Sequence, residues 1–353
     1  MTKMVNTLFG LVCALVSPAL LAHHGAITNP VLYHSDNLIE MEGEITEVLW
    51  RNPHVRGRMT VVDDAGEETV WEVELGPGPG GMDQRGLVEE DFFGRVRIAG
   101  FLSRRGTNSI GAIHVMLPSG VEFVQGNREL RWSNETVTRT GPPVDPALEA
   151  EERRTAHSIF RTWTKTPGRG PEQDALADSR DWLNERGREL NALYDPVADN
   201  AEVSECRQGM PDYMFDPVPI RIADEGDRIT FESWEYNGRR TIYMDTATSP
   251  EPEPSSVGYS TGRWADETLV VATTHLDFPY WSEFGLPQSD QATILERFTP
   301  SEDGNDLEYS LTVFDPVNFT RPFTVHDNRY WAPGRDIPPY DCVVDWADQE
   351  SAP

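Results

Sequence analysis

The sequence has few cysteines and few basic residues. It holds 3 cysteines in 353 residues, and 30 lysines and arginines stand against 59 aspartates and glutamates. The formal net charge of −29 argues against nucleic acid as a partner, because its phosphates would be repelled. We interpret the acidic surface as a means of staying soluble.

Several catalytic motifs are also missing. The chain has no Gly-x-Ser-x-Gly elbow, no His-Glu-x-x-His and no dinucleotide-binding fingerprint. The glycine-rich stretch at residues 76–81 is not a phosphate cradle, because its prolines remove the amide donors that a phosphate needs. The sequence therefore gives no motif support for a common hydrolase, a zinc protease or a dinucleotide-binding enzyme.

A long apolar run occurs only near the N-terminus, at Leu8–Leu21. With Lys3 before it and Ala22 after it, this run predicts a signal peptide at residues 1–22. The run is too short for a membrane-spanning helix, so we expect a periplasmic or secreted protein with no transmembrane segment after cleavage. Cys13 would be lost with the signal peptide, unless it is a site of lipid attachment.

Export leaves Cys206 and Cys342. Two cysteines in an oxidising compartment most simply form one disulfide. A metal–thiolate site is the alternative, and it is less well supported because the chain has no CxxC pair.

Residues 23–130 predict a first β domain. Its expected strands are Leu38–Trp50, Val55–Asp63, Glu68–Leu75, Arg95–Phe101 and Ile110–Leu117. Five strands in a segment with little helical pattern predict a small OB-like barrel.

Residues 131–204 predict a linker and a helical segment. Prolines and glycines at 138–146 mark the boundary, Asp145–Trp163 reads as a helix, and a second helical stretch runs from Pro171 to about Tyr194.

Residues 205–345 predict a second β domain, and 346–353 a tail. Asp227–Glu235 and Arg239–Asp245 alternate polar and apolar residues around Asn237-Gly238, the pattern of a hairpin with a type I′ turn. About seven such strands predict an antiparallel, calycin- or lipocalin-like barrel, and the whole chain is expected to be mainly β.

Cleavage after Ala22 would place His23 at the new N-terminus. Its free amine and ring nitrogen suit Cu(II), and His24, His34 or His54 could add a third nitrogen. The alternative is that these histidines are solvated and bind nothing.

Residues 22–124 resemble an exported bacterial family of unknown function, DUF6152. The resemblance implies a small exported β domain, and the family typically keeps the His-His pair and an Asn-Pro-His. The matching segments are Ala22-His23-His24, Met41–Ile45 with Trp50, Asn52-Pro53-His54, Trp71–Gly76, Gly100-Phe101 and Leu117–Gly120.

Residues 171–342 resemble a second exported family without assigned activity, which implies a calycin-like periplasmic barrel. Here Cys342 leads into Val343-Val344-Asp345, where that family often has His-Glu-Gly-Asn. The matching segments are Tyr194–Pro196, Cys206 with Gly209–Pro211, Arg240–Asp245, Gly262–Trp264, Glu267–Val271, Thr273–His275, Glu296–Phe298 and Asp315-Pro316.

Aromatic residues with a few polar groups are typical of a small-molecule pocket. The candidate catalytic residues are His275, Asp277, His326 and Asp327, because a histidine with a carboxylate can act as a general base. The candidate ligand-binding residues are Arg239, Tyr280, Trp281, Glu296 and Trp331. Alternatively, the aromatic residues only cap the barrel, and Glu296 forms a structural ion pair with Arg239 or Arg240.

These observations predict an exported protein that binds a small apolar or amphipathic ligand in its C-terminal barrel. A copper ion bound at the mature N-terminus is a second, separate hypothesis. An enzyme acting on such a ligand is one alternative, and a non-catalytic module that docks on another protein is the other. The sequence does not identify a protein partner.

Overall fold

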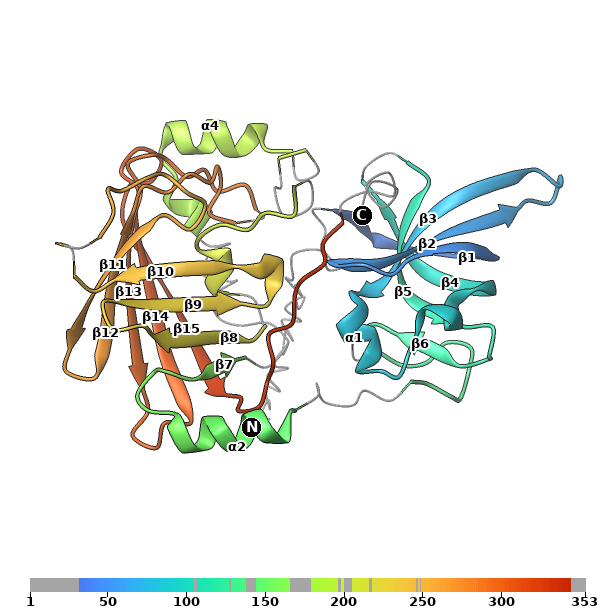
Figure 1. Cartoon of the computed structure of the whole chain (residues 1–353). Coiled ribbons are helices and arrows are strands. Elements are labelled where there is room, and N and C mark those ends of the chain that lie inside the picture. The colour runs from blue at the N-terminus through green and yellow to red at the C-terminus, as the bar shows by residue number, and fades with distance from the viewer. Residues whose placement is uncertain are drawn as a thin grey trace, which may run out of the picture.

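The computed structural model describes residues 32–104, 107–126, 128–137, 144–165, 179–195, 198–199, 205–215, 218–245, 247, 249–282 and 284–343. The fold is mainly β, as predicted. One sheet forms in the N-terminal part and a closed barrel forms in the C-terminal part (Figure 1).

The N-terminal sheet has six strands in the order β3-β2-β1-β4-β5-β6. β3 also pairs in parallel with β5, through Glu72–Glu74 and Ser109–Gly111, so β1 to β5 close into the predicted OB-like barrel. The strands are β1 Tyr33–Leu49, β2 His54–Val62, β3 Glu68–Pro77, β4 Gly94–Ser103, β5 Ser109–Met116 and β6 Glu122–Val124, with helices α1 Pro79–Asp83 and η1 Glu89–Phe92 between β3 and β4.

Alternation of side chains builds the core of this barrel. Along β2, Val55 and Met59 face inward and are buried, while Arg58 lies between them and pairs with Glu47 on the surface. Gly100 marks a point where strands approach closely, because a Cβ atom there would lie 2.0 Å from the carbonyl oxygen of Gly111.

The C-terminal barrel has nine strands in the closed order β10-β11-β12-β13-β14-β15-β7-β8-β9. Eight of the nine junctions are antiparallel, and β10 meets β11 in parallel over two residue pairs. The strands are β7 Thr162–Thr164, β8 Ile220–Asp224, β9 Arg228–Ser233, β10 Arg239–Tyr243, β11 Tyr259–Ala265, β12 Thr268–Thr274, β13 Thr293–Pro300, β14 Asp306–Phe314 and β15 Phe323–Trp331.

Side chains occupy the described interior of this barrel. Phe298 packs edge-on against Phe231 with ring centroids 5.2 Å apart, and it stacks on Tyr309 at 4.8 Å. Arg240 and Glu296, both fully buried, form an ion pair among these rings. Ser260 and Thr273 accept further hydrogen bonds from Arg240, and the hydroxyl of Tyr309 donates to Glu296 at 2.8 Å.

The expected helix at Asp145–Trp163 is wrong in its second half. Helix α2 spans Pro146–Thr155, where the side chain of Asp145 caps its first turn. The chain then turns through Ser158, whose φ is 48°, into β7. β7 bridges β15 and β8 and thereby closes the barrel, so tertiary pairing outweighs the local helical pattern.

Two further local expectations differ. The described part of the second helical stretch is interrupted, because Asn184, which caps α4 Glu185–Leu193, separates this helix from η2 Ser179–Trp182. The part of the prediction before Ser179 lies outside the described residues. The positive φ angles of the hairpin turn fall on Tyr236 and Asn237, while Gly238 has a φ of −62°. A short 3₁₀ helix, η4 Glu235–Asn237, forms there, and another, η3 Asp212–Met214, precedes β8.

Cys206 and Cys342 form the predicted disulfide, with Cα atoms 6.1 Å apart. Cys342 lies in Tyr340–Val343, a segment that we call the C-terminal strap. The strap runs between the two barrels (Figure 1). Tyr340 exchanges hydrogen bonds with the Asn237 side chain of the C-terminal barrel, and Arg56 of the N-terminal barrel donates to the carbonyl of Val343 at 3.2 Å.

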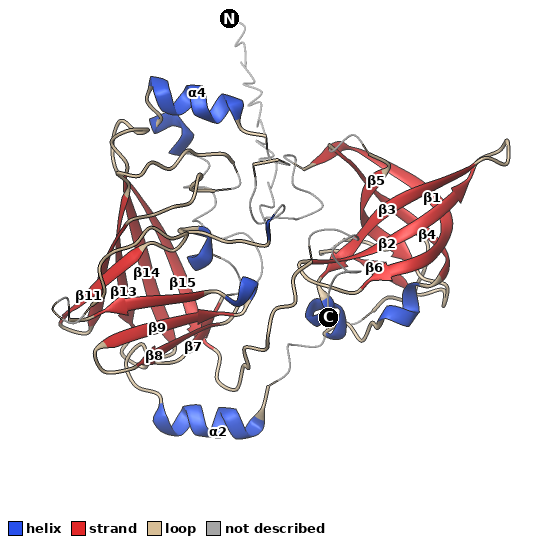
Figure 2. Ribbon diagram, turned by 45° about the horizontal axis from the view of Figure 1, so that its top comes forward, coloured by secondary structure: helices blue, strands red, loops and turns tan. Residues whose placement is uncertain are grey.

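The helices of the described segments are short (Figure 2). None of them is both long and apolar enough to cross a membrane.

Candidate functional site

The four candidate catalytic residues do not form a histidine–carboxylate pair. His275 and Asp277 are exposed after β12, where the imidazole Nδ1 of His275 contacts the Thr274 hydroxyl at 2.8 Å. His326 and Asp327 are neighbours in β15 and therefore point to opposite faces. His326 is exposed, whereas Asp327 is buried 3.5 Å from the ammonium group of Lys165.

The five candidate ligand-binding residues have separate surroundings. Glu296 is buried against Arg240, and Arg239 is exposed and pairs with Glu225 and Glu232. The Tyr280 ring packs against Tyr194, and the buried Trp281 ring donates to Asp315 at 3.4 Å. Trp331 lies beside the guanidinium groups of Arg153 and Arg161.

The candidate copper ligands are only partly placed. His23 and His24 lie outside the described residues, so the copper hypothesis stays a prediction. His54 begins β2, and its Nδ1 lies 2.7 Å from a carboxylate oxygen of Glu74. Among the described residues, no three His, Cys, Asp or Glu side chains are grouped to hold a metal ion.

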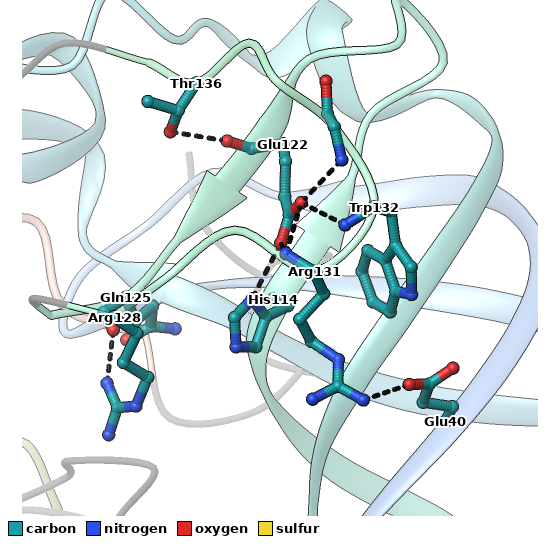
Figure 3. Close-up of polar contacts among 9 residues, drawn as sticks. Glu40, His114, Glu122, Gln125, Arg128, Arg131, Trp132 and Thr136 are labelled. Carbon is teal, nitrogen blue, oxygen red and sulfur yellow. Dashed lines mark hydrogen bonds and ion pairs between the residues drawn. The ribbon is translucent and has the colours of Figure 1, made fainter.

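A buried histidine–carboxylate pair is present in the N-terminal barrel instead. His114 on β5 and Glu122 on β6 lie on one face of a hairpin, as diagonal neighbours across the two strands. The Nδ1 atom of His114 is 2.8 Å from a carboxylate oxygen of Glu122 (Figure 3). His114 is 4% exposed and Glu122 is 0% exposed, so both groups are shielded from water.

Glu122 also organises the loop that follows β6. Its two carboxylate oxygens accept hydrogen bonds from the backbone N–H groups of Arg131, Trp132 and Ser133 at 2.8–3.1 Å. Burial alone would raise the pKa of Glu122, but these N–H groups and His114 outweigh that effect and hold the pKa below its ordinary value. Glu122 is therefore an ionised, buried carboxylate.

The Glu122 carboxylate determines which ring nitrogen of His114 donates a hydrogen bond. An ionised carboxylate only accepts hydrogen bonds, so Nδ1 of His114 must donate. In the neutral ring, Nε2 is then left as an acceptor. His114 lines a pocket of about 690 Å³ that is open to solvent, together with Glu40 and residues Arg128–Trp132.

One wall of the pocket is a layer of arginine and tryptophan side chains. The Trp132 ring packs edge-on against His114 at 5.9 Å, and the guanidinium groups of Arg97 and Arg131 lie over it at 5.0 and 5.7 Å. Glu40 accepts hydrogen bonds from Arg131 (Figure 3) and from Arg97, and these bonds lower the pKa of Glu40.

Arg128 lies on another side of the pocket. It is half-buried, and this burial lowers its pKa. Within the described residues its guanidinium makes one hydrogen bond, to the carbonyl of Gln125 (Figure 3), and no carboxylate contacts it. A desolvated cation without a carboxylate is electrostatically prepared for an anion.

Sequence reasoning did not identify this site. Leu117–Gly120 is the turn of the β5–β6 hairpin, and pairing across it would have brought His114 and Glu122 together. The residues that complete the pocket come from an irregular loop, for which no periodic pattern exists.

Three comparisons with known proteins bear on the chain. A family model described as a family of unknown function, DUF6152, matches residues 11–109, which confirms the resemblance of the N-terminal barrel. The match ends at Ser109, so the second resemblance stays a prediction. No curated protein and no solved structure matches the chain.

Proposed function

We propose that this protein is an exported small-molecule-binding protein whose ligand site is the pocket beside His114 in the N-terminal barrel. The observation that carries the proposal is the buried Glu122–His114 pair at the edge of a 690 Å³ pocket. Such a volume fits a small ligand, and the lining offers polar groups for orientation beside the apolar surfaces of Leu130 and Trp132.

The C-terminal barrel supports a different role. Its described interior holds packed aromatic rings and a buried ion pair whose donors and acceptors satisfy one another. Residues arranged in this way stabilise a core and offer few polar atoms to a ligand. The ligand expected inside this barrel stays a prediction, and we favour the N-terminal pocket as the binding site.

Export is the second part of the proposal. The apolar run after Lys3 is typical of a signal peptide, and a disulfide between Cys206 and Cys342 is compatible with an oxidising compartment. In this proposal the mature protein works in the periplasm or outside the cell, where its ligand is a free small molecule.

The test is native mass spectrometry of the mature protein purified from its own host. We expect a bound small molecule that is lost in Leu130→Trp, because Leu130 lines the pocket and an indole ring would fill it. Val62→Trp is the matched control, since it adds the same ring at a side chain that is 58% exposed on β2.

Retention of the same molecule by both variants would contradict the proposal, because the ligand would then sit elsewhere. Loss from the Leu130 variant alone supports it. Circular dichroism of both variants shows whether the barrel has stayed folded.

A further inference from the structure

The pocket beside His114 differs in charge from the rest of the chain. Acidic residues outnumber basic ones by 59 to 30 over the whole sequence. The charged side chains that line the pocket are Arg128, Arg131, Glu40 and Glu129, and Glu40 pairs with Arg131 and Arg97. The charges of the lining side chains therefore balance, in a protein whose net charge is −29.

Arg128 adds a cation that these pairs do not use. A guanidinium has five N–H donors, and Arg128 uses one of them within the described part of the chain. Glu129 also lines the pocket, but it is exposed, and no ion pair joins it to Arg128 among the described residues.

From this arrangement we infer that the ligand of the pocket carries an anionic group, a carboxylate or a phosphate, which is bound by Arg128 beside the ring of His114. This inference rests on the function proposed above and names the chemical class of its ligand. The planar guanidinium matches the two oxygens of either group, and the desolvation of Arg128 strengthens the interaction.

A cation is a poor alternative occupant. His114 offers one nitrogen, and Glu40 is already engaged by two arginines. Arg128 and Arg131 would repel a metal ion approaching this nitrogen. A neutral ligand would leave Arg128 desolvated without an anion, and charged groups left in that state are costly.

The experiment is a titration of the full mature chain, with its disulfide intact, with benzoate, with inorganic phosphate and with benzamide. Benzamide matches benzoate in shape but carries no charge. The readout is the NMR signals of the His114 ring nitrogens. We expect shifts with benzoate or phosphate and none with benzamide at the same concentration.

Two variants locate the anion. Arg128→Gln is expected to weaken binding by about tenfold or more, which is the usual effect of losing a charge-assisted hydrogen bond. Arg95→Gln is the matched control, because it removes the same charge from a side chain that is 82% exposed in the same barrel. It should change the affinity by less than about threefold.

Equal binding of benzoate and benzamide, or unchanged affinity in Arg128→Gln, would overturn the inference, as would an absence of shifts with both anions. A neutral molecule retained in the pocket by native mass spectrometry would also overturn it and would leave the proposed function standing. The proposed function fails separately, when the Leu130 variant retains the native ligand.

Discussion

The backbone of Asn52 pairs with the backbone around Cys342, although the two residues lie near opposite ends of the chain. The N–H of Asn52 donates to the carbonyl of Asp341, and the N–H of Val343 donates to the carbonyl of Asn52, both at 3.0 Å. Cys342 is also bonded to Cys206. The strap therefore joins the N-terminal barrel to the disulfide of the C-terminal half.

The first prediction concerns this disulfide. The bridge spans 136 residues, and replacing both cysteines by serine should lower the free energy of unfolding by about 4–5 kcal/mol in the chain-entropy model. The strap should also become more accessible to proteases, because one of its attachments is gone. Chemical denaturation and limited proteolysis of the oxidised protein and the double variant measure both effects.

The reduced wild-type protein is the control for that comparison and should behave as the serine variant does. Equal stability of the oxidised protein and the double variant would show that the bridge does not restrict the unfolded chain as expected.

The second prediction concerns the ion pair inside the C-terminal barrel. Arg240→Met should cost about 3–5 kcal/mol of stability, because Glu296 would be left as a buried charge without its cation. The double variant Arg240→Met with Glu296→Leu should recover most of that loss. Urea denaturation of the three proteins provides the comparison.

The exposed pair of Arg58 and Glu47 is the matched control. Its atoms lie 2.8 Å apart, but its side chains are 41% and 54% exposed, so Arg58→Ala should cost less than about 1 kcal/mol. If Arg58→Ala and Arg240→Met lowered the free energy of unfolding by similar amounts, burial of the Arg240–Glu296 pair would not explain the cost of breaking it.

The sequence allowed most of the architecture to be predicted. Strand β2 of the N-terminal barrel alternates clearly, as Val55 and Met59 show, and this alternation survives in the fold. The disulfide followed from two cysteines in a chain that the sequence predicts to be exported. The predicted ion pair of Glu296 is confirmed, and its partner is Arg240 rather than Arg239.

What escaped prediction depends on contacts between distant segments. Thr162 and Trp163 of β7 were assigned to a helix, because only β8 and β15 make Thr162–Thr164 a strand. The pair of His114 and Glu122 has no motif, and Arg128 belongs to a loop without periodicity. Side-chain direction in such loops follows from tertiary packing, which local sequence does not encode.

The third prediction keeps the copper hypothesis open to measurement. If His23 is the first residue of the mature chain, its free amine and ring should bind Cu(II). A mature protein with one extra residue before His23 should then bind Cu(II) more weakly, in a competition titration with a coloured chelator. Equal affinity of the two proteins would reject a site built on the terminal amine.

The last prediction concerns Glu122 and pH. Its carboxylate is buried and holds three backbone N–H groups, so Glu122→Gln should cost about 1–3 kcal/mol near neutral pH. The pKa of Glu122 in the folded protein lies below its ordinary value of 4.5. A lowered pKa stabilises the fold above the unfolded-state value, and the stabilisation is lost as the pH falls through the folded-state value.

The difference in unfolding free energy between wild type and Glu122→Gln should therefore be full at pH 7 and shrink below about pH 4.5. Glu135→Gln is the matched control, because it neutralises an exposed carboxylate on the same loop and should leave stability nearly unchanged at every pH. A difference that grew as the pH fell would mean that the carboxylate is protonated in the folded protein. The geometry of the pocket would then have to be explained without an ionised Glu122 behind His114.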